Sequence, residues 1–340
     1  MAGSSSMVRK ERNPEGRAGE RGDIVLQLAT AFWAPRCLHV VAELGVADHI
    51  DGEARSAAEL AAAVGADPDA LNRVLRLLVS YGIFDARGSG YAHNEASRTL
   101  RSDHPMSKRA YVRFSGNRTN WAAWGSLEKS VRTGKPAAHI AGGPFAALSN
   151  NPDAARMFDE AMTAKAHGDV AAIVPAYDFS SSATIADVGG GRGHLLQAIL
   201  DATPAARGIV FDLPHVVARL PSSDRMRAVG GDFLTGELPA ADTYLLMNVL
   251  HDWPDEASAI ILRAVRRAAP AGAKVMVIEA VLPDGPEPHW SKTLDINMLR
   301  IGGRERTEGE YAALLSAAGF RVSRVIGTES PYSIVEAIAA

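Results

Sequence analysis

Hydrophobic positions recur along this chain with two different spacings, and the change falls near residue 180. Between 22 and 170 the spacing is mostly that of helices, as in 68–80, where one face carries Leu71, Val74, Leu75, Leu78 and Val79. From 183 onward, short apolar runs alternate with amphipathic stretches. We predict strands at 183–190, 207–214, 226–233, 242–250, 273–282, 320–328 and 332–339, and helices at 193–203, 215–220, 255–269 and 307–319.

This alternation of strands and helices predicts an α/β fold with a mostly parallel, doubly wound sheet. Because the last two strands follow each other directly, they predict an antiparallel end of that sheet. Right-handed crossovers place ligands at the carboxyl ends of the parallel strands. We therefore look for the chemistry of the protein in the residues that follow each strand.

The first half contains a helix, a second helix and a hairpin, which is the outline of a winged helix. Ser56 and Glu59 have the spacing of a capping box, and a Gly-Ser-Gly turn divides a hairpin at 82–94. Winged helices often bind DNA through basic residues on the second helix. That helix offers only Arg73 and Arg76, which is more typical of a solvated face.

Composition narrows the class of protein further. The net charge of −3 gives no support for nucleic-acid binding, and the single cysteine, Cys37, fits a reducing cytoplasm and makes a Cys-based zinc site unexpected. We find no apolar run of about 18 residues and expect no membrane span. The polar segment 1–21 is expected to be disordered, whereas 23–50 is apolar on most faces and needs a partner, either the rest of the chain or a second subunit.

The strongest candidate for a ligand site is "IADVGGGRGHL" at 185–195, where a strand ends, three glycines follow and a helix begins. Glycines allow positive φ angles and close approach of a ligand to the backbone, although a tight turn alone explains the same pattern. Two later strands end in acids, Asp212 in "VFDLP" and Asp232 in "GGDF". Asp212 is placed to accept both hydroxyls of a ribose, Asp232 to accept from an adenine amino group, and Phe233 to stack on the adenine ring.

Asp187, just before the glycines, indicates which class of cofactor the loop would bind. A dinucleotide site has the spacing Gly-x-Gly-x-x-Gly and leaves the helix amino end free for a pyrophosphate. An acid at 187 disfavours a diphosphate and suits a cofactor with an ammonium group, such as the methionine end of S-adenosylmethionine. The sequence has no Gly-x-x-x-x-Gly-Lys-Ser/Thr stretch, which argues against a P-loop NTPase.

Six motifs in order, "DVGGGRGHL", "FDLP", "GDF", "LHDW", "IEAVLPDG" and "GGRERTEGEY…AAGF", resemble the S-adenosylmethionine-dependent small-molecule O-methyltransferases. The resemblance covers roughly 23–338 and is strongest to bacterial natural-product tailoring enzymes. It implies a Rossmann-like methyltransferase sheet, no metal, S-adenosylhomocysteine as product, and a homodimer formed through a winged-helix region that does not bind DNA. The implied division is a disordered 1–21, a dimerisation domain at 22–110, a helical substrate-lining region at 111–178 and a catalytic domain at 179–340.

The resemblance also assigns roles to single residues. Those expected around the methionine part of the cofactor are Asp187, Gly189 and Gly191, with Thr163 near its carboxylate. Those expected at the ribose and adenine are Asp212, Leu213, Asp232 and Phe233. Met247 stands where many plant members have a lysine, which leaves its contact with the cofactor open.

His251, in "NVLHDWPDE", is the candidate general base, because it follows a strand whose carboxyl end borders the cofactor cleft. The alternative is a loop-corner histidine bonded to backbone. Family positions suggest Glu279 and Glu305 as the groups that orient it, although a surface ion pair with Arg304 or Arg306 equally explains Glu305. For Asp252 we favour capping of the next helix over chemistry.

The helical region is expected to line an acceptor pocket. The residues predicted to contact the acceptor are Phe158, Met162, Asn248 and Met298, chosen from a wider set that includes Trp121, Trp124, Phe145, Met157 and Asn297. Such a slot suits a planar aromatic or polyketide acceptor, and the leading hypothesis is methylation of a phenolic hydroxyl of a secondary metabolite. The alternatives are N- or C-methylation or diverged chemistry on the same fold, and a winged-helix regulator that senses S-adenosylmethionine.

Overall fold

The computed structural model describes residues 23–136, 151–218, 220 and 223–340. The disorder expected at 1–21 and the candidate pocket residue Phe145 both lie outside these ranges. The chain divides into two compact units, 1–104 and 105–340, which are described separately below.

The first unit confirms the predicted succession of helix, helix and hairpin. Helix α3 (Ala57–Val64) begins with the expected capping box between Ser56 and Glu59, and α4 (Pro68–Ser80) begins at Asp67, whose side chain accepts a hydrogen bond from the amide of Ala70 at 2.8 Å. A small sheet follows, in which β3 (Gly90–Ala92) lies between β1 (Arg55–Ser56) and β2 (Asp85–Arg87). The unit also contains α2 (Trp33–Leu44), η1 (Val46–His49) and α5 (Glu95–Arg98).

The first helix of this unit bears on the expectation that the chain has no membrane span. The helix Asp23–Leu44, which turns briefly at 31–32, is long and apolar enough to cross a membrane by length and composition alone. A helix from the core of a soluble protein passes the same test. Much of its apolar surface is uncovered within this chain, including Ile24, Val25, Leu26, Leu28, Phe32 and Trp33. This is the stretch that we expected to need a partner.

The second unit opens with helices and continues into a seven-stranded sheet of order β11-β12-β8-β7-β4-β5-β6. Its strands are β4 (Thr184–Val188), β5 (Arg207–Asp212), β6 (Met226–Gly230), β7 (Thr243–Met247), β8 (Lys274–Glu279), β11 (Phe320–Gly327) and β12 (Ser333–Ala339). The first five are parallel, and β12 pairs antiparallel with both β8 and β11. The predicted sheet, including its antiparallel end, is thereby confirmed.

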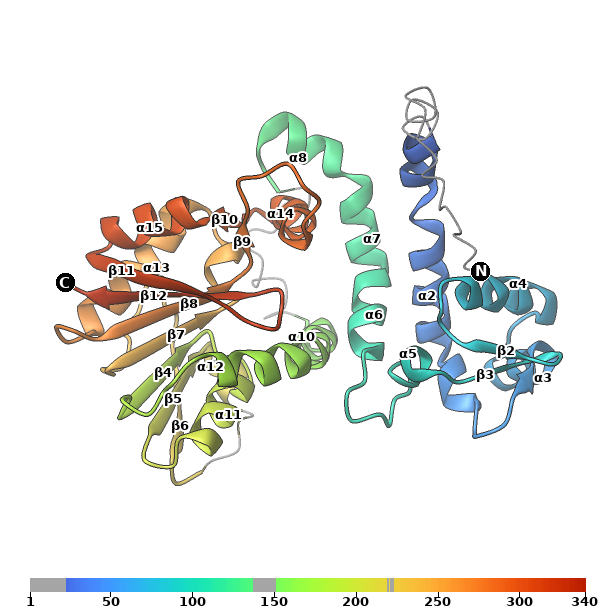
Figure 1. Cartoon of the computed structure of the whole chain (residues 1–340), viewed down its shortest axis with the longest axis horizontal. Coiled ribbons are helices and arrows are strands. Elements are labelled where there is room, and N and C mark those ends of the chain that lie inside the picture. Colours follow the sequence, from blue (N-terminus) through green and yellow to red (C-terminus); the bar gives the residue numbers. More distant parts are fainter. Residues whose placement is uncertain (1–22, 137–150, 219, 221–222) are drawn as a thin grey trace, which may run out of the picture. The chain divides into compact units, whose positions relative to one another are not determined.

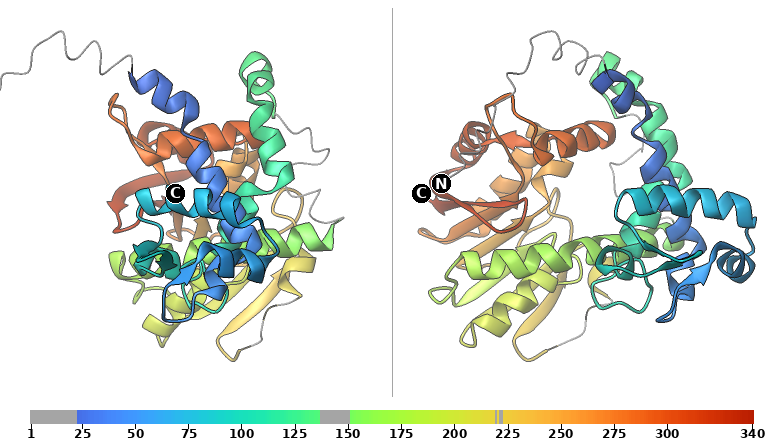
Figure 2. Two further views of the ribbon diagram at one scale, coloured as in Figure 1. Left: turned by 90° about the vertical axis from the view of Figure 1, so that its right-hand side faces the viewer. Right: turned by 45° about the vertical axis from the view of Figure 1, so that its right-hand side comes forward.

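Helices cover both faces of this sheet, so the unit has three layers (Figure 1 and Figure 2). Helices α13 (Asp255–Ala268) and α15 (Glu308–Ala317) contribute to one core, together with Leu246 of β7. Helix α11 (His194–Ala202) and the end of α10 (Pro152–Ile173) contribute to the other, together with Leu245. Neighbouring residues of a strand thus point into opposite cores, as a sheet buried on both faces requires.

The remaining elements of the second unit are short helices and one small strand pair. The helices are α6 (Arg109–Gly116), α7 (Arg118–Gly125), α8 (Leu127–Thr133), η2 (Val174–Ala176), α12 (Pro214–Val217), η3 (Leu250–Asp252) and α14 (Trp290–Ile301). Sequence patterning missed α14. It also missed the parallel pairing of β9 (Val281–Leu282) with β10 (Arg306–Thr307), which brings residue 305 close to the end of β8.

Candidate active site

The glycine loop after β4 packs against neighbouring residues so closely that two of its positions leave no room for a side chain. Gly189 has a φ of 71°, and a Cβ there would lie 2.8 Å from a methyl group of Val249. A Cβ at Gly190 would lie 2.6 Å from the carboxyl carbon of Asp187. The bare backbone lets the loop pack between the ends of β4 and β7, and a Cβ at Gly191, where φ is 55°, would meet no atom within 4 Å.

Two carboxylates border this loop. Asp187 is buried at the end of β4, where burial and then the charge of Asp212 raise its pKa to about 7. Asp212 ends the neighbouring strand β5 and accepts hydrogen bonds from the amides of Gly191, at 2.8 Å, and Leu213, at 2.7 Å. Burial also raises the pKa of Asp212. Because both acids lie at the carboxyl ends of neighbouring parallel strands, this end of the sheet favours a ligand with a positive charge and hydroxyl donors.

The other predicted cofactor residues lie around the same edge or on α10. Phe233 follows β6 and stands edge-to-face against Trp253, with its ring 3.6 Å from the place of a Cβ at Gly189. The carboxylate of Asp232 accepts from the amide of Leu234 at 2.8 Å and so shapes its own turn. Met247 is half-buried at the end of β7 and packs against the second core, and Thr163 is half-buried in α10.

His251 lies in η3, directly after β7, and is 5% exposed. Its Nδ1 atom is 2.7 Å from Oε1 of Glu305, so the ring bonds to a carboxylate and not to backbone. A carboxylate partner keeps a proton on Nδ1, and the neutral ring then carries its lone pair on Nε2. Glu305 is 1% exposed, which excludes the surface ion pair that local sequence allowed.

Glu279 holds the backbone around His251, and not the ring. One oxygen accepts from the amides of Val249, at 3.0 Å, and His251, at 3.2 Å. The other accepts from the hydroxyl of Tyr311 at 2.5 Å. Glu279 is fully buried at the end of β8, so this single carboxylate joins three groups that would otherwise lack partners.

The expectation that Asp252 caps the following helix is wrong. Pro254 occupies the cap position of α13, and no side chain bonds to the free amides there. The carboxylate of Asp252 instead lies 3.7 Å from Nε2 of His251. The backbone geometry decides this, because η3 turns residue 252 back toward the ring before the helix begins.

The acids around His251 control its charge. Burial lowers its pKa, but the charge of Asp252 and the bond to Glu305 outweigh that effect and raise the pKa of His251 to about 9. The pKa of Asp252 is itself raised to about 6, mainly by burial. The imidazole therefore carries a proton at neutral pH in the structure as it stands.

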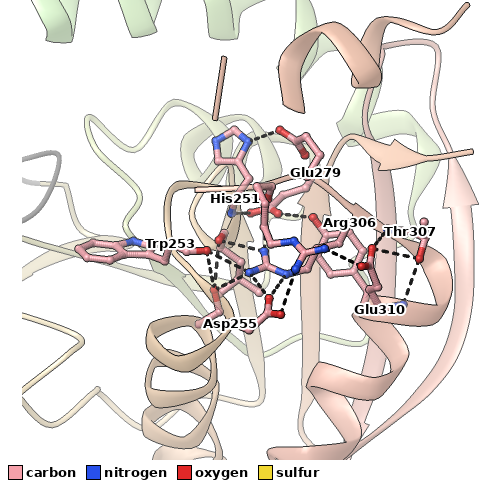
Figure 3. Close-up of polar contacts among 12 residues, drawn as sticks. His251, Trp253, Asp255, Glu279, Arg306, Thr307 and Glu310 are labelled. Atoms are coloured by element: carbon pink, nitrogen blue, oxygen red, sulfur yellow. Dashed lines mark hydrogen bonds and ion pairs between the residues drawn. The ribbon is translucent and has the colours of Figure 1, made fainter. Parts of the chain in front are cut away.

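The segment 303–306 holds the loop of His251 from its other side. The amide of Arg304 donates to the carbonyl of His251 at 2.8 Å, and a side chain at Gly303 would overlap that carbonyl. Arg306, which is 1% exposed, pairs with Asp255 at 2.8 Å (Figure 3). It also donates to the carbonyls of Leu250 and Trp253 and to the hydroxyl of Ser258. Sequence reasoning missed Arg306, because an arginine inside "GGRERTE" has the pattern of a solvated turn.

Family models match most of the chain. An O-methyltransferase domain matches residues 124–321, and an O-methyltransferase dimerisation domain matches residues 26–103. The chain belongs to the O-methyltransferase family. The second match covers most of the apolar helix 23–44, and family membership confirms that the chain is an S-adenosylmethionine-dependent methyltransferase with an N-terminal dimerisation domain.

Relatives of this O-methyltransferase include enzymes named for phenazine and for mitomycin biosynthesis. It is 41% identical to a phenazine O-methyltransferase of Lysobacter antibioticus, over 92% of this chain and 95% of that protein. It is 36% identical to the mitomycin biosynthesis 6-O-methyltransferase of Streptomyces lavendulae, over 92% and 93%. One relative, 36% identical over 89% and 92%, is the phenazine-1-carboxylate N-methyltransferase of Pseudomonas aeruginosa.

Solved structures agree with this placement. The crystal structure of LaPhzM superposes with a TM-score of 0.87 at 40% identity, covering 94% of this chain and 99% of that one. Human N-acetylserotonin methyltransferase, solved with S-adenosylmethionine, gives a TM-score of 0.87 at 27% identity, covering 98% and 100%. A methyltransferase of calicheamicin biosynthesis, solved with S-adenosylhomocysteine, gives 0.84 at 34% identity, covering 97% and 100%.

The predicted acceptor residues of this O-methyltransferase all fall in the second unit. Phe158 and Met162 lie on α10, where the ring of Phe158 stands edge-to-face with Phe114 at 5.7 Å. Met298 is buried in α14. Asn248 follows β7 with a φ of 54°, and its buried Oδ1 accepts no hydrogen bond from the residues that the structure describes. Three of the wider candidates contact other side chains: Asn297 and Trp124 contact Arg300, and Met157 contacts Asn117.

Proposed function

We propose that this O-methyltransferase moves a methyl group from S-adenosylmethionine to a phenolic hydroxyl of a small-molecule secondary metabolite, with His251 as the general base. One observation carries the proposal. The imidazole is bonded through Nδ1 to the buried Glu305, next to a glycine loop and two carboxylates that suit the cofactor. Orientation by a carboxylate is what a histidine base requires.

The residues at the sheet edge fit S-adenosylmethionine. Its ammonium group would face Asp187, a carboxylate that burial leaves without charge compensation. The backbone of Gly189 and Gly191 would lie against its methionine part, and Thr163 near its carboxylate. The ribose hydroxyls would bond to Asp212, next to Leu213, and the adenine would lie between Asp232 and Phe233. Met247 completes this surface. When bound, the cofactor supplies an electrophilic methyl group, and S-adenosylhomocysteine is the product.

The proton of the acceptor hydroxyl would pass to Nε2 of His251. A phenol has a pKa of about 10 and a free imidazole about 6.5, so transfer to a free imidazole costs about 5 kcal/mol. With the pKa of His251 raised to about 9, the same transfer costs about 1.4 kcal/mol. The same raised pKa also has a cost, because at pH 7 only about one His251 ring in a hundred is neutral and able to accept a proton. A bound sulfonium beside the ring would increase that fraction, because like charges lower the pKa of an imidazolium.

The acceptor would lie against Phe158, Met162 and Met298, with Asn248 accepting a hydrogen bond from it. An aromatic acceptor suits such apolar side chains. Relatives bear names that point the same way, including a 3-amino-4-hydroxybenzoate 4-O-methyltransferase of Streptomyces cremeus and a naphthoate 7-O-methyltransferase of Streptomyces carzinostaticus. Antibiotic biosynthesis is therefore the setting that we propose.

N-methylation is the second candidate, because one relative carries that name. The two reactions differ in what they require of the base. A neutral aromatic amine attacks with its lone pair before losing a proton, whereas a phenol needs the proton removed as the bond forms. The ring bonded to Glu305 favours the hydroxyl.

We further propose a cytoplasmic homodimer joined through the first unit, with no nucleic acid or membrane as partner. The dimerisation-domain match covers 26–103, and the uncovered apolar residues of helix 23–44 supply a surface for a second copy. Analytical ultracentrifugation tests the dimer. A monomer at micromolar concentration would contradict it.

The reaction itself is tested by incubating the protein with S-adenosylmethionine and matched aromatic acceptors that differ only in a hydroxyl or an amino group. Mass spectrometry should find a gain of one methyl group on the hydroxyl member, together with S-adenosylhomocysteine. Methylation confined to the amino member would favour the second candidate. Hydrolysis or retention of the cofactor with no methylated product across a broad panel would count against both.

A further inference from the structure

Lys165 interrupts an apolar stripe on helix α10. Residues 158, 162, 165 and 169 follow each other at helical spacing and so share one face. Phe158 and Met162 on this face are the proposed acceptor contacts. One turn further along, the stripe presents the ammonium group of Lys165 and then the carboxyl group of Asp169.

The ammonium group of Lys165 has a neutral partner and no paired anion. Its Nζ donates a hydrogen bond to the hydroxyl of Tyr332 and lies 4.8 Å from the centre of that ring. Within the described ranges of the chain, no carboxylate forms an ion pair with Lys165. Tyr332 is 1% exposed, and burial lowers the pKa of Lys165 although Asp169, Asp252 and Glu305 act in the opposite direction. Lys165 is half-buried, a cation withdrawn from water without a bonded anion is costly, and two of its N–H groups remain to be used.

Lys165 belongs to the neighbourhood of the proposed base. The charges of Asp252 and Glu305 act on it, and its own charge acts on Asp252. Tyr332 also connects it to the loop of His251, because the side chain of Asn248, which follows β7 three residues before His251, acts on the Tyr332 hydroxyl. Met162 lies one helical turn before Lys165 on α10, so a molecule in contact with Met162 lies within reach of this ammonium group.

We propose that Lys165 binds a carboxylate on the acceptor, so that the preferred substrates are hydroxylated aromatic acids. This inference rests on the proposed function and names the class of its acceptor. The acids of the chain near Lys165 do not supply the anion that its ammonium group lacks. Glu305 is bonded to the ring of His251, Asp252 lies beside Nε2 of the same ring, and burial raises the pKa of Asp169 toward its neutral form.

The test compares binding of an acid and its ester by the full-length protein loaded with S-adenosylhomocysteine. The probes are 1,4-dihydroxy-2-naphthoic acid, which was solved in complex with a structural neighbour, and its methyl ester. Calorimetry should show the wild-type protein binding the acid more tightly than the ester. Lys165→Met, which keeps the length of the side chain, should lower the affinity for the acid about 10- to 100-fold and leave the affinity for the ester nearly unchanged.

Tyr332→Phe is the matched second variant, because it removes the hydroxyl that orients Lys165 and keeps the ring. Tyr332→Phe should lower the affinity for the acid by a smaller factor than Lys165→Met does. Equal weakening of acid and ester in Lys165→Met would place Lys165 at the shared hydroxyl and overturn the carboxylate assignment. So would a wild-type protein that prefers the ester or binds neither probe. Because binding is read without turnover, a failure here is separate from a failure to transfer methyl groups.

Discussion

The Nδ1 atom of His251 lies 2.7 Å from Oε1 of Glu305, and both side chains are buried. The two residues are 54 positions apart and belong to different elements. Their contact decides which ring nitrogen holds the proton and which one faces a substrate. The same contact, with Asp252 at 3.7 Å on the other nitrogen, makes the ring a stronger base than a free histidine.

Replacing His251 with alanine should lower methyl transfer to a phenol about 10²- to 10⁴-fold, because the variant lacks the proposed proton acceptor. Affinity for S-adenosylhomocysteine should stay within a factor of about three, since all the proposed cofactor contacts except Met247 lie on other strand ends or on α10. Steady-state kinetics and calorimetry measure the two effects. Turnover close to that of the wild type would remove His251 from the role of base.

Replacing Glu305 with glutamine should change the pH profile as well as the rate. With the pKa of His251 at about 9, kcat/KM for a phenolic acceptor should rise with pH toward about 9, because only the neutral ring accepts a proton. Glu305→Gln removes a charge that raises this pKa, so the midpoint should move to lower pH while the maximal rate falls. An unchanged midpoint in the variant would show that another group titrates.

Cofactor affinity should depend on pH through Asp187. Its pKa in the folded protein, about 7, lies above the ordinary value of 3.8, so the carboxyl group is partly neutral near neutral pH. An ammonium ligand favours the ionised form, and S-adenosylhomocysteine should therefore bind more tightly as pH rises from about 6 to about 8. Calorimetry in buffers of different ionisation enthalpy should detect proton release on binding. Asp187→Asn should bind more weakly and lose this pH dependence, and a variant with the wild-type slope would contradict the assignment.

Replacing Asp212 with alanine should weaken binding of S-adenosylhomocysteine about 10- to 100-fold by removing the acceptor of the ribose hydroxyls. Asp201→Ala is the control, because Asp201 is exposed on helix α11 of the same unit and should leave affinity unchanged. Equal affinities for wild type and Asp212→Ala, measured by calorimetry, would refute the role of Asp212.

Replacing Gly303 with alanine should displace the loop of His251, because the added methyl group overlaps the carbonyl of that residue. We expect a loss of about 1–3 kcal/mol in the free energy of unfolding and a fall in kcat. Gly309→Ala is the matched control, since its Cβ meets no atom within 4 Å and the residue lies in helix α15. The control should be neutral or more stable. A Gly303→Ala protein as stable and active as wild type would show that the close packing is unimportant.

Much of the fold follows from local patterns in the sequence. Strands such as 184–188 and 243–247 are mostly apolar, as strands covered on both faces must be, with Asp187 as the charged exception, and α3 begins at a recognisable capping box. Helix α14 escaped prediction, because its apolar positions are interrupted by Lys292, Asp295 and Arg300. These charged residues, spread along the helix, hide the helical spacing on which prediction depends.

The sequence by itself determined the family, the succession of strands and helices along the chain and the candidates for cofactor binding, because each of these depends on short motifs of neighbouring residues. Only the tertiary structure decided what the acids around His251 do. Glu305 reaches the ring, Glu279 holds the backbone beneath it, and Asp252 faces Nε2 instead of capping α13. The pairing of β9 with β10 sets this arrangement, and two strands of two residues each leave too short a pattern to be recognised in sequence.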